Sequence, residues 1–135
     1  MSSGAVLTQS GFNSILSQVF GTATINQFQF FVIGTSNQTP VTTDTGLIGT
    51  TTNWTAGGTS FKSYVTTYPQ FDTTNQKVTL RGYISAAEAT GVVIYEYADV
   101  NNAATKVPAG RFVWNDAITK TASNQLTIIT QYKRN

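Results

Sequence analysis

The side chains that could perform chemistry are few, and they are spread along the chain. The 135-residue sequence contains no histidine and no cysteine. It therefore lacks the commonest general base, any thiolate nucleophile, and the side chains that most often bind transition metals. The acidic candidates that remain are Asp44, Asp72, Glu88, Glu96, Asp99 and Asp116.

The spacing of these carboxylates does not favour acid–base catalysis. Glu88 and Glu96 lie eight residues apart across the strand-like segment "EATGVVIYE". A strand rises about 3.3 Å per residue, so their side chains would be roughly 25 Å apart along it. That is too far for a catalytic pair. Serine and threonine are abundant, but the sequence indicates no group that would activate them. We expect no catalytic residues and no enzymatic activity.

Metal and cofactor sites are not predicted either. Asp44, in "TTDTG", could ligate calcium together with backbone carbonyls, but one carboxylate among hydroxyl groups makes a weak site. We favour an Asx-turn at this position. Neither the G-x-G-x-x-G pattern nor the P-loop pattern for phosphate binding is present. We expect no metal and no cofactor.

The charge and composition of the sequence exclude two classes of partner, nucleic acids and membranes. Eight basic residues against six acidic ones give a net charge of +2, and the basic residues are scattered. Nucleic-acid binding needs a local concentration of them, so we expect no nucleic-acid partner. The opening "MSSGAVLTQSG" has no basic segment or long apolar stretch, which predicts neither a signal peptide nor a membrane span. The lack of cysteine fits assembly in a reducing cytoplasm.

The elements that would position these residues are mainly strands. Threonine is the commonest residue with 24 copies, whereas glutamate has two and lysine five, which is a β-protein composition. Alternating or apolar runs separated by turn residues predict strands. The predicted strands are "INQFQFFVIG", "SFKSYVTTY", "QKVTLRGYIS", "GVVIYEYADV", "RFVWN" and "NQLTIITQYK".

One helix is predicted, within "LTQSGFNSILSQVFG". Its apolar residues recur at helical spacing from Phe12 to Val19, Thr8 or Ser10 can cap its start, and Gly21 can close its end in the left-handed conformation. We expect its apolar face to cover the core of its own domain, with docking on a neighbouring subunit as the alternative. The expected core includes Phe12, Ile15, Leu16, Phe30, Val78, Leu80, Ile84 and Ile128.

The fold class follows from these elements. We predict a mainly β protein, an antiparallel β-sandwich or partly closed barrel with one N-terminal amphipathic helix. Its length suits a single domain over residues 1–135, and no internal repeat or linker interrupts it.

The segment "GTSNQTPVTTDTGL" is predicted to be a packed surface loop. Gly34 ends the preceding strand, Pro40 stiffens an extended crossing, Asp44 bonds back to the backbone, and Leu47 provides an apolar plug.

This loop is part of a wider resemblance. The order of "LTQSGFNSIL", this loop, "EATGVVIYEY" and "RFVWNDAITKTASNQLTIITQY" resembles the N-terminal attachment domain of tail-collar fibre proteins of tailed bacteriophages, and similar small virion proteins. Those proteins carry a T-x-x-G helix start, a G-T-G-x-x-x-P-x-x-x-D-T-x-L loop, an E-A-x-G-x-I-x-E segment and a closing run of Arg, Lys and β-strand. The resemblance spans Leu7 to Tyr132.

When the motif residues are matched to this sequence by position, the resemblance implies structural roles for them and no active site. The matching residues are Gly34, Thr35, Pro40, Asp44, Thr45, Leu47, Glu88, Ala89, Gly91, Ile94, Glu96, Arg111 and Lys120. Two departures concern backbone freedom: Ser36 replaces the loop's second glycine, and Tyr97 with Ala98 stands where a glycine often follows the second glutamate.

The resemblance implies a non-enzymatic virion structural protein, assembled in the host cytoplasm, that acts as a tail, baseplate or fibre adaptor. Fibre proteins continue into a shaft, whereas this sequence ends at Asn135, so we expect it to bind other virion proteins. The alternative is a capsid decoration protein on the head. A lesser alternative is a carbohydrate-binding module that uses Trp54, Tyr64, Tyr83 or Tyr95. Low charge and undefended edge strands predict a homo-oligomer, and the resemblance suggests a trimer.

Overall fold

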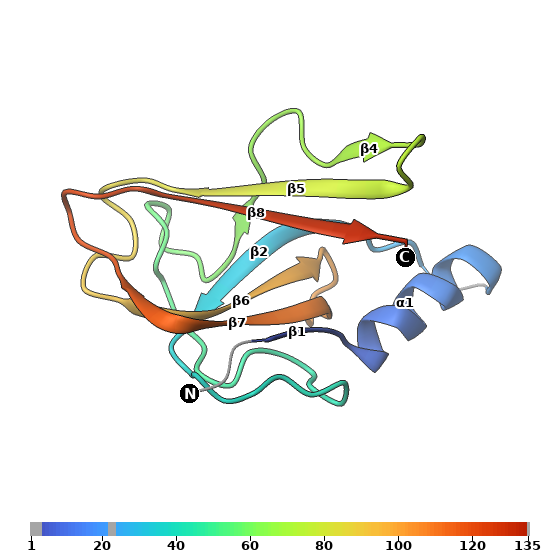
Figure 1. Ribbon diagram of the computed structural model, residues 1–135, viewed down its shortest axis with the longest axis horizontal. Coiled ribbons are helices and arrows are strands. Elements are labelled where there is room, and N and C mark those ends of the chain that lie inside the picture. Colours follow the sequence, from blue (N-terminus) through green and yellow to red (C-terminus); the bar gives the residue numbers. More distant parts are fainter. Residues whose placement is uncertain (1–3, 22–23, 135) are drawn as a thin grey trace.

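The protein is a two-layer β-sandwich with a helix projecting from one end (Figure 1). The computed structural model describes residues 4–21 and 24–134; Asn135 lies outside them. The elements in chain order are β1 (Gly4–Leu7), α1 (Gln9–Phe20), β2 (Phe28–Gly34), β3 (Lys62–Ser63), β4 (Gln70–Asp72), β5 (Lys77–Ile84), β6 (Val93–Asn101), β7 (Pro108–Thr119) and β8 (Leu126–Lys133).

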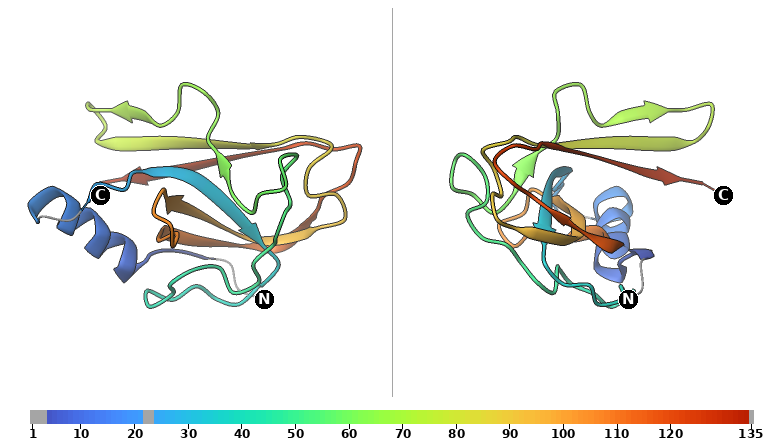
Figure 2. Two further views of the ribbon diagram at one scale, coloured as in Figure 1. Left: turned by 180° about the vertical axis from the view of Figure 1, so that it is seen from behind. Right: turned by 60° about the vertical axis from the view of Figure 1, so that its left-hand side comes forward.

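The two sheets are antiparallel and do not close into a barrel. Sheet A has five strands in the order β1-β7-β6-β2-β3, and sheet B has three in the order β4-β5-β8. Figure 2 shows sheet B lying across one face of sheet A, with α1 at one end of the two layers in the left-hand view. The predicted class, a mainly β sandwich with one N-terminal helix, is confirmed. In the described part of the chain, no helix is long and apolar enough to cross a membrane.

Several strand predictions need correction in their extent. Within "SFKSYVTTY" only Lys62–Ser63 forms a strand, because the chain then turns away toward sheet B. The strand predicted at "RFVWN" runs from Pro108 to Thr119. The short strands β1 and β4 were not predicted, since three or four residues carry too little periodic pattern to identify a strand.

Aromatic and branched side chains between the sheets form the core. Phe31 is fully buried at its centre, with the rings of Trp54 and Tyr97 each 5.6 Å away. A Cβ atom at Gly82 would lie 2.9 Å from the Phe31 ring, so β5 needs a glycine where it crosses this ring. The other buried apolar members of the cluster are Ile33, Tyr64, Leu80, Ile84, Ala89, Ile94 and Ile128.

The helix is anchored to the sandwich at its first turn. It starts at Gln9, and of the two predicted caps it is the Thr8 hydroxyl that acts, accepting from the Gly11 amide at 3.1 Å and donating to the Pro108 carbonyl at 2.6 Å. Gly11 is the only buried residue of α1, and a Cβ there would lie 2.7 Å from the Ala109 Cα. Thr8 and Gly11 therefore fasten the helix to the start of β7.

The prediction that the helix face covers the domain's own core is wrong. Phe12, Ile15 and Leu16 remain 48%, 37% and 39% exposed, because α1 lies at the end of the sandwich and an open groove separates its apolar side from the core. Of the other predicted core residues, Leu80, Ile84 and Ile128 are buried, while Phe30 and Val78 are half-buried.

The predicted C-terminal cap also needs correction. Gly21 has a φ of −106°, not the left-handed conformation. Its amide donates to the Ser17 carbonyl at 3.0 Å, and a Cβ at Gly21 would lie 2.6 Å from that oxygen. Close approach to the last helical turn, rather than a positive φ, is what favours glycine here.

Substitution of Leu16 and Ile84 by alanine tests this division between core and projecting helix. Leu16→Ala should change the free energy of unfolding by less than about 1 kcal/mol, because Leu16 is 39% exposed and is not part of the buried core. Ile84→Ala should cost about 2–5 kcal/mol. Urea unfolding of the two variants measures both values, and equal losses would contradict the assignment of α1 to the surface.

Candidate functional site

The buried charges of sheet A hold the predicted loop against its outer face. Glu96 on β6 is fully buried and accepts four hydrogen bonds. Three come from loop amides: Gly49 at 2.6 Å, Ser36 at 3.2 Å and Ile48 at 3.2 Å. The fourth comes from the Arg111 Nε at 2.7 Å. The carboxylate therefore joins both ends of the loop to the sheet.

Arg111 on β7 completes this arrangement from the neighbouring strand. Its side chain is fully buried, and besides Glu96 it contacts the Asp44 carboxylate at 3.1 Å through Nη1 and the Gln38 carbonyl at 3.0 Å through Nη2. Asp44 also accepts from the Val41 amide at 2.9 Å, so it bonds back to the backbone as predicted and forms an ion pair as well. We call this group of three side chains, Glu96, Arg111 and Asp44, the loop clamp.

The other predicted loop residues fit around the clamp. Gly34 lies so close that a Cβ would be 2.5 Å from the Glu96 Oε1, and the Thr35 amide donates to the Gly49 carbonyl at 2.7 Å. Pro40 is buried, whereas Thr45 is exposed. Leu47 is half-buried and lines a cavity of about 210 Å³ over Val32, Ala98 and Val100 of the outer face.

The backbone accommodates Ser36, Tyr97 and Ala98, where the resemblance noted above would place glycines. Ser36 needs no positive φ, and its amide reaches Glu96. Tyr97 and Ala98 are fully buried on opposite faces of β6. A tyrosine there fills the core where a glycine would leave space.

Glu88, Gly91 and Lys120 form a second polar group at the turn between β5 and β6. Glu88, whose side chain is 4% exposed, accepts from Lys62 Nζ at 2.6 Å and from the amides of Ser85 and Ala56. Burial would raise the Glu88 pKa, but the Lys62 ammonium and these amides prevail and lower the pKa to about 2.

Lys120 does not pair with a carboxylate. Its ammonium donates to the carbonyls of Ala86 and Thr121 at 3.0 and 2.8 Å, and its backbone carbonyl accepts from the Gly91 amide. Gly91 has a φ of +84°, which favours glycine at this turn. Gly91 and Lys120 therefore both stabilise this turn.

Asp99 is the centre of a third polar group, which the sequence did not predict. It is fully buried on the inner face of β6, and both its oxygens are occupied. Tyr64 and Tyr97 donate to Oδ1 at 2.7 and 2.6 Å; Tyr132 and Thr130 donate to Oδ2 at 2.8 and 3.1 Å. Because Thr130 and Tyr132 belong to β8, this group links the two sheets.

Burial determines the protonation behaviour of the Asp99 group. Desolvation raises the pKa of Asp99, although the four hydroxyl donors act in the opposite direction. Burial and the neighbouring Asp99 also raise the pKa of Tyr64, Tyr97 and Tyr132 well above their ordinary range. These phenols stay protonated and act as hydrogen-bond donors.

An apolar groove opens beside the Asp99 group, between α1 and the end of the sandwich. It has a volume of about 830 Å³. Its walls include Phe12 and Ile15 of α1 and Phe71 of β4, which is 75% exposed. Tyr64, Asp99 and Tyr132 also line it, so the groove reaches the polar group.

Among the described residues, the carboxylates of Asp44, Glu88, Glu96 and Asp99 are held in structural contacts. The part of the chain that the structure describes contains no group of three or more acidic side chains placed to hold a metal ion. Trp54 and Tyr64, two of the aromatics considered for sugar binding, are buried in the core and cannot stack on a glycan, while Tyr83 and Tyr95 are half-buried.

Comparison with known proteins adds no assignment: the chain matches no protein-family model, no curated protein and no solved structure.

Removing the guanidinium of the loop clamp tests its structural role. Arg111→Met leaves Glu96 and Asp44 without their cation and should cost about 3–5 kcal/mol of unfolding free energy. Arg134→Met, at an exposed position, is the control and should stay within about 0.5 kcal/mol. Urea unfolding measures both. Equal stabilities would show that the clamp contributes nothing.

The Asp99 group predicts a distinct pH dependence of stability. A raised folded-state pKa means that the folded protein binds this proton more tightly than the unfolded chain does. The contribution of Asp99 is then most favourable below its ordinary pKa of 3.8, and it is lost as the pH rises through the raised value.

The variant Asp99→Asn should remove this slope, because an amide does not titrate. The free energy of unfolding of the wild type should fall relative to that of the variant as the pH rises above about 4. Asp116→Asn, at an exposed carboxylate, is the control. Urea unfolding across the pH range measures both, and a difference that moves the other way would contradict the burial argument.

Proposed function

We propose that this protein is a non-enzymatic structural protein of a bacteriophage virion, where it acts as an adaptor at the tail, baseplate or fibre. The family-like motifs of the sequence support the virion setting. The exposed apolar surface of α1 supports action through binding, and that surface is the observation on which the proposal rests.

The α1 surface consists of five apolar side chains that water can reach: Phe12, Ile15, Leu16, Val19 and Phe20. The last two are 67% and 83% exposed, and they lie in the half of the helix farthest from its anchor at Thr8 and Gly11. Contiguous apolar surface of this kind is rare on monomeric proteins and marks contact sites.

The chemistry of the α1 surface favours an apolar partner. Gln9–Phe20 contains no charged residue, and the adjoining groove of about 830 Å³ is lined mainly by apolar side chains. An apolar, uncharged segment of a neighbouring virion protein fits this surface, because a charged one would lose its hydration without gaining an ion pair. An amphipathic helix or an extended apolar segment could cover the α1 surface and fill the groove.

The polar interior supports a role without catalysis. The buried carboxylates Glu88, Glu96 and Asp99 each accept three or four hydrogen bonds, and Asp44 is held by Arg111 and the Val41 amide. A general base needs a free lone pair directed at substrate. These groups instead hold loops and sheets in place.

Changing two exposed helix residues tests the proposal in the virion. A phage that lacks this gene is complemented with wild type or with the double variant Val19→Ser, Phe20→Ser. The variant should keep the wild-type unfolding midpoint, because both side chains are exposed, yet be lost from purified particles.

The matched control is Val93→Ser, an exposed apolar residue on β6 that should be incorporated normally. Quantitative mass spectrometry of purified virions measures the content of each variant. Incorporation of the double variant at the wild-type level would refute the α1 contact, and absence of the wild-type protein from virions would refute the virion assignment.

A further inference from the structure

One long strand of the sandwich has an open edge. Within the part of the chain that the structure describes, β8 pairs with β5 on one side and has no strand on the other. It is eight residues long, whereas the other outermost strands, β1, β3 and β4, have four, two and three residues. In Figure 1, β8 runs along the front of the molecule with nothing across it. β8 is therefore the longest open edge.

This edge lacks the features that usually prevent strand addition. Natural edge strands are protected by charged side chains, proline or bulges. From Leu126 to Tyr132, β8 has no charged residue, proline or glycine. Its pairing with β5 runs over eight residues without a register shift, whereas the β2–β6 and β6–β7 pairings are both interrupted. The outer edge of β8 is regular and uncharged.

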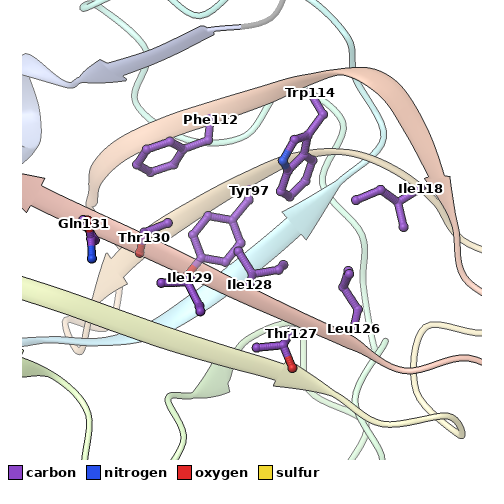
Figure 3. A pocket seen from close by; sticks show the side chains of 10 residues that line it. All are labelled: Tyr97, Phe112, Trp114, Ile118, Leu126, Thr127, Ile128, Ile129, Thr130 and Gln131. Carbon is purple, nitrogen blue, oxygen red and sulfur yellow. The ribbon is translucent and has the colours of Figure 1, made fainter.

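A cavity of about 310 Å³ lies beside this edge, between β8 and β7. Figure 3 shows Phe112, Trp114 and Ile118 of β7 facing it together with side chains of β8. The buried Ile128 and the exposed Thr127, Ile129 and Gln131 all line it, so the cavity extends to the strand edge. A strand added to β8 would close its open side.

We propose that β8 is a self-association site, at which it pairs antiparallel with β8 of a second copy. Pairing like with like uses the longest open edge of both copies, whereas any other outermost strand would supply at most four residues. The absence of charge over Leu126–Tyr132 means that two copies meet without repulsion. The product is one six-stranded sheet across a two-fold axis.

The exposed isoleucine of β8 fixes the register. Residues that pair across strands point to the same face, so the two-fold axis must pass through a residue position. Ile129 is 62% exposed, and an axis at Ile129 places it against its own copy. Thr127 then lies opposite Gln131, and Lys133 lies opposite Gln125 rather than the other Lys133. This register buries the apolar side chain and separates the two ammonium groups.

Single cysteines test the pairing directly, because the natural sequence contains none. Opposite residues in an antiparallel pair have Cα atoms about 4.5–5.5 Å apart, which a disulfide can bridge. Under mild oxidation, Ile129→Cys should become a covalent dimer. Thr127→Cys, two residues away on the same face, should stay uncrosslinked because its two copies would lie roughly 13 Å apart. A mixture of Thr127→Cys and Gln131→Cys should crosslink.

A charge at the same position gives the complementary test. Ile129→Lys would set two ammonium groups against each other, so a dimer seen for the wild type by sedimentation velocity should become a monomer. Measured at a concentration at which the wild type is monomeric, the variant's unfolding midpoint should fall only slightly, since the site is exposed, although the new ammonium faces Arg81 of β5. Equal crosslinking at positions 127 and 129, a wild-type monomer at high concentration, or a trimer that Ile129→Lys leaves intact would each overturn the proposal.

This inference goes beyond the proposed function and rests on a different surface. A two-fold pair through β8 also contrasts with the threefold state that the family resemblance suggests, and the measured mass separates the two. Loss of the β8 contact would leave the α1 surface and the virion assignment untouched, because the incorporation assay alters only the helix.

Discussion

The positive charge of Arg111, enclosed without contact with water, is the constraint on which much of this structure depends. A buried guanidinium is tolerated only when its donors all find acceptors. Glu96 lies on the neighbouring strand, but Asp44 and the Gln38 carbonyl belong to the loop after β2. The loop must therefore fold back over sheet A. In doing so it covers Val32, Ala98 and Val100, so the outer face of sheet A becomes a second buried layer.

This constraint also determines which surfaces remain for binding. Sheet A is covered by the loop on one face and by sheet B on the other, and the Asp99 group joins the two sheets from within. Two uncharged features are left at the periphery, the α1 surface and the open edge of β8. The buried carboxylates Glu88, Glu96 and Asp99 all serve to hold the fold together. The two features lie on separate parts of the molecule, which is why we propose that each contacts a different neighbour.

Patterns that depend on local geometry could be predicted from the sequence. Helical spacing and the Thr8 cap located α1, and alternation in "QKVTLRGYIS" located β5. The resemblance brought Gly34, Asp44, Glu96 and Arg111 together in one motif set, and the structure places them in one group.

Features that depend on distant partners could not be predicted. Amphipathic spacing shows which side of α1 is apolar but not what covers it, and this is why Phe12 and Leu16 were misplaced. Asp99 is visible as an acidic residue in an apolar strand, yet its hydroxyl donors come from segments up to 35 residues away. The Lys62–Glu88 pair likewise joins residues 26 apart. No local pattern links such residues before the sheets form.

The central claim, that this protein works through its surfaces in a virion, is tested most directly by high-resolution electron cryomicroscopy of purified particles. The account predicts density for this sandwich at the tail, baseplate or fibre attachment, with α1 buried against an apolar segment of a neighbouring protein. Density on the head, with the same helix contact, would instead support the capsid decoration alternative. Density in which α1 points freely into solvent, or particles without this chain, would contradict the account.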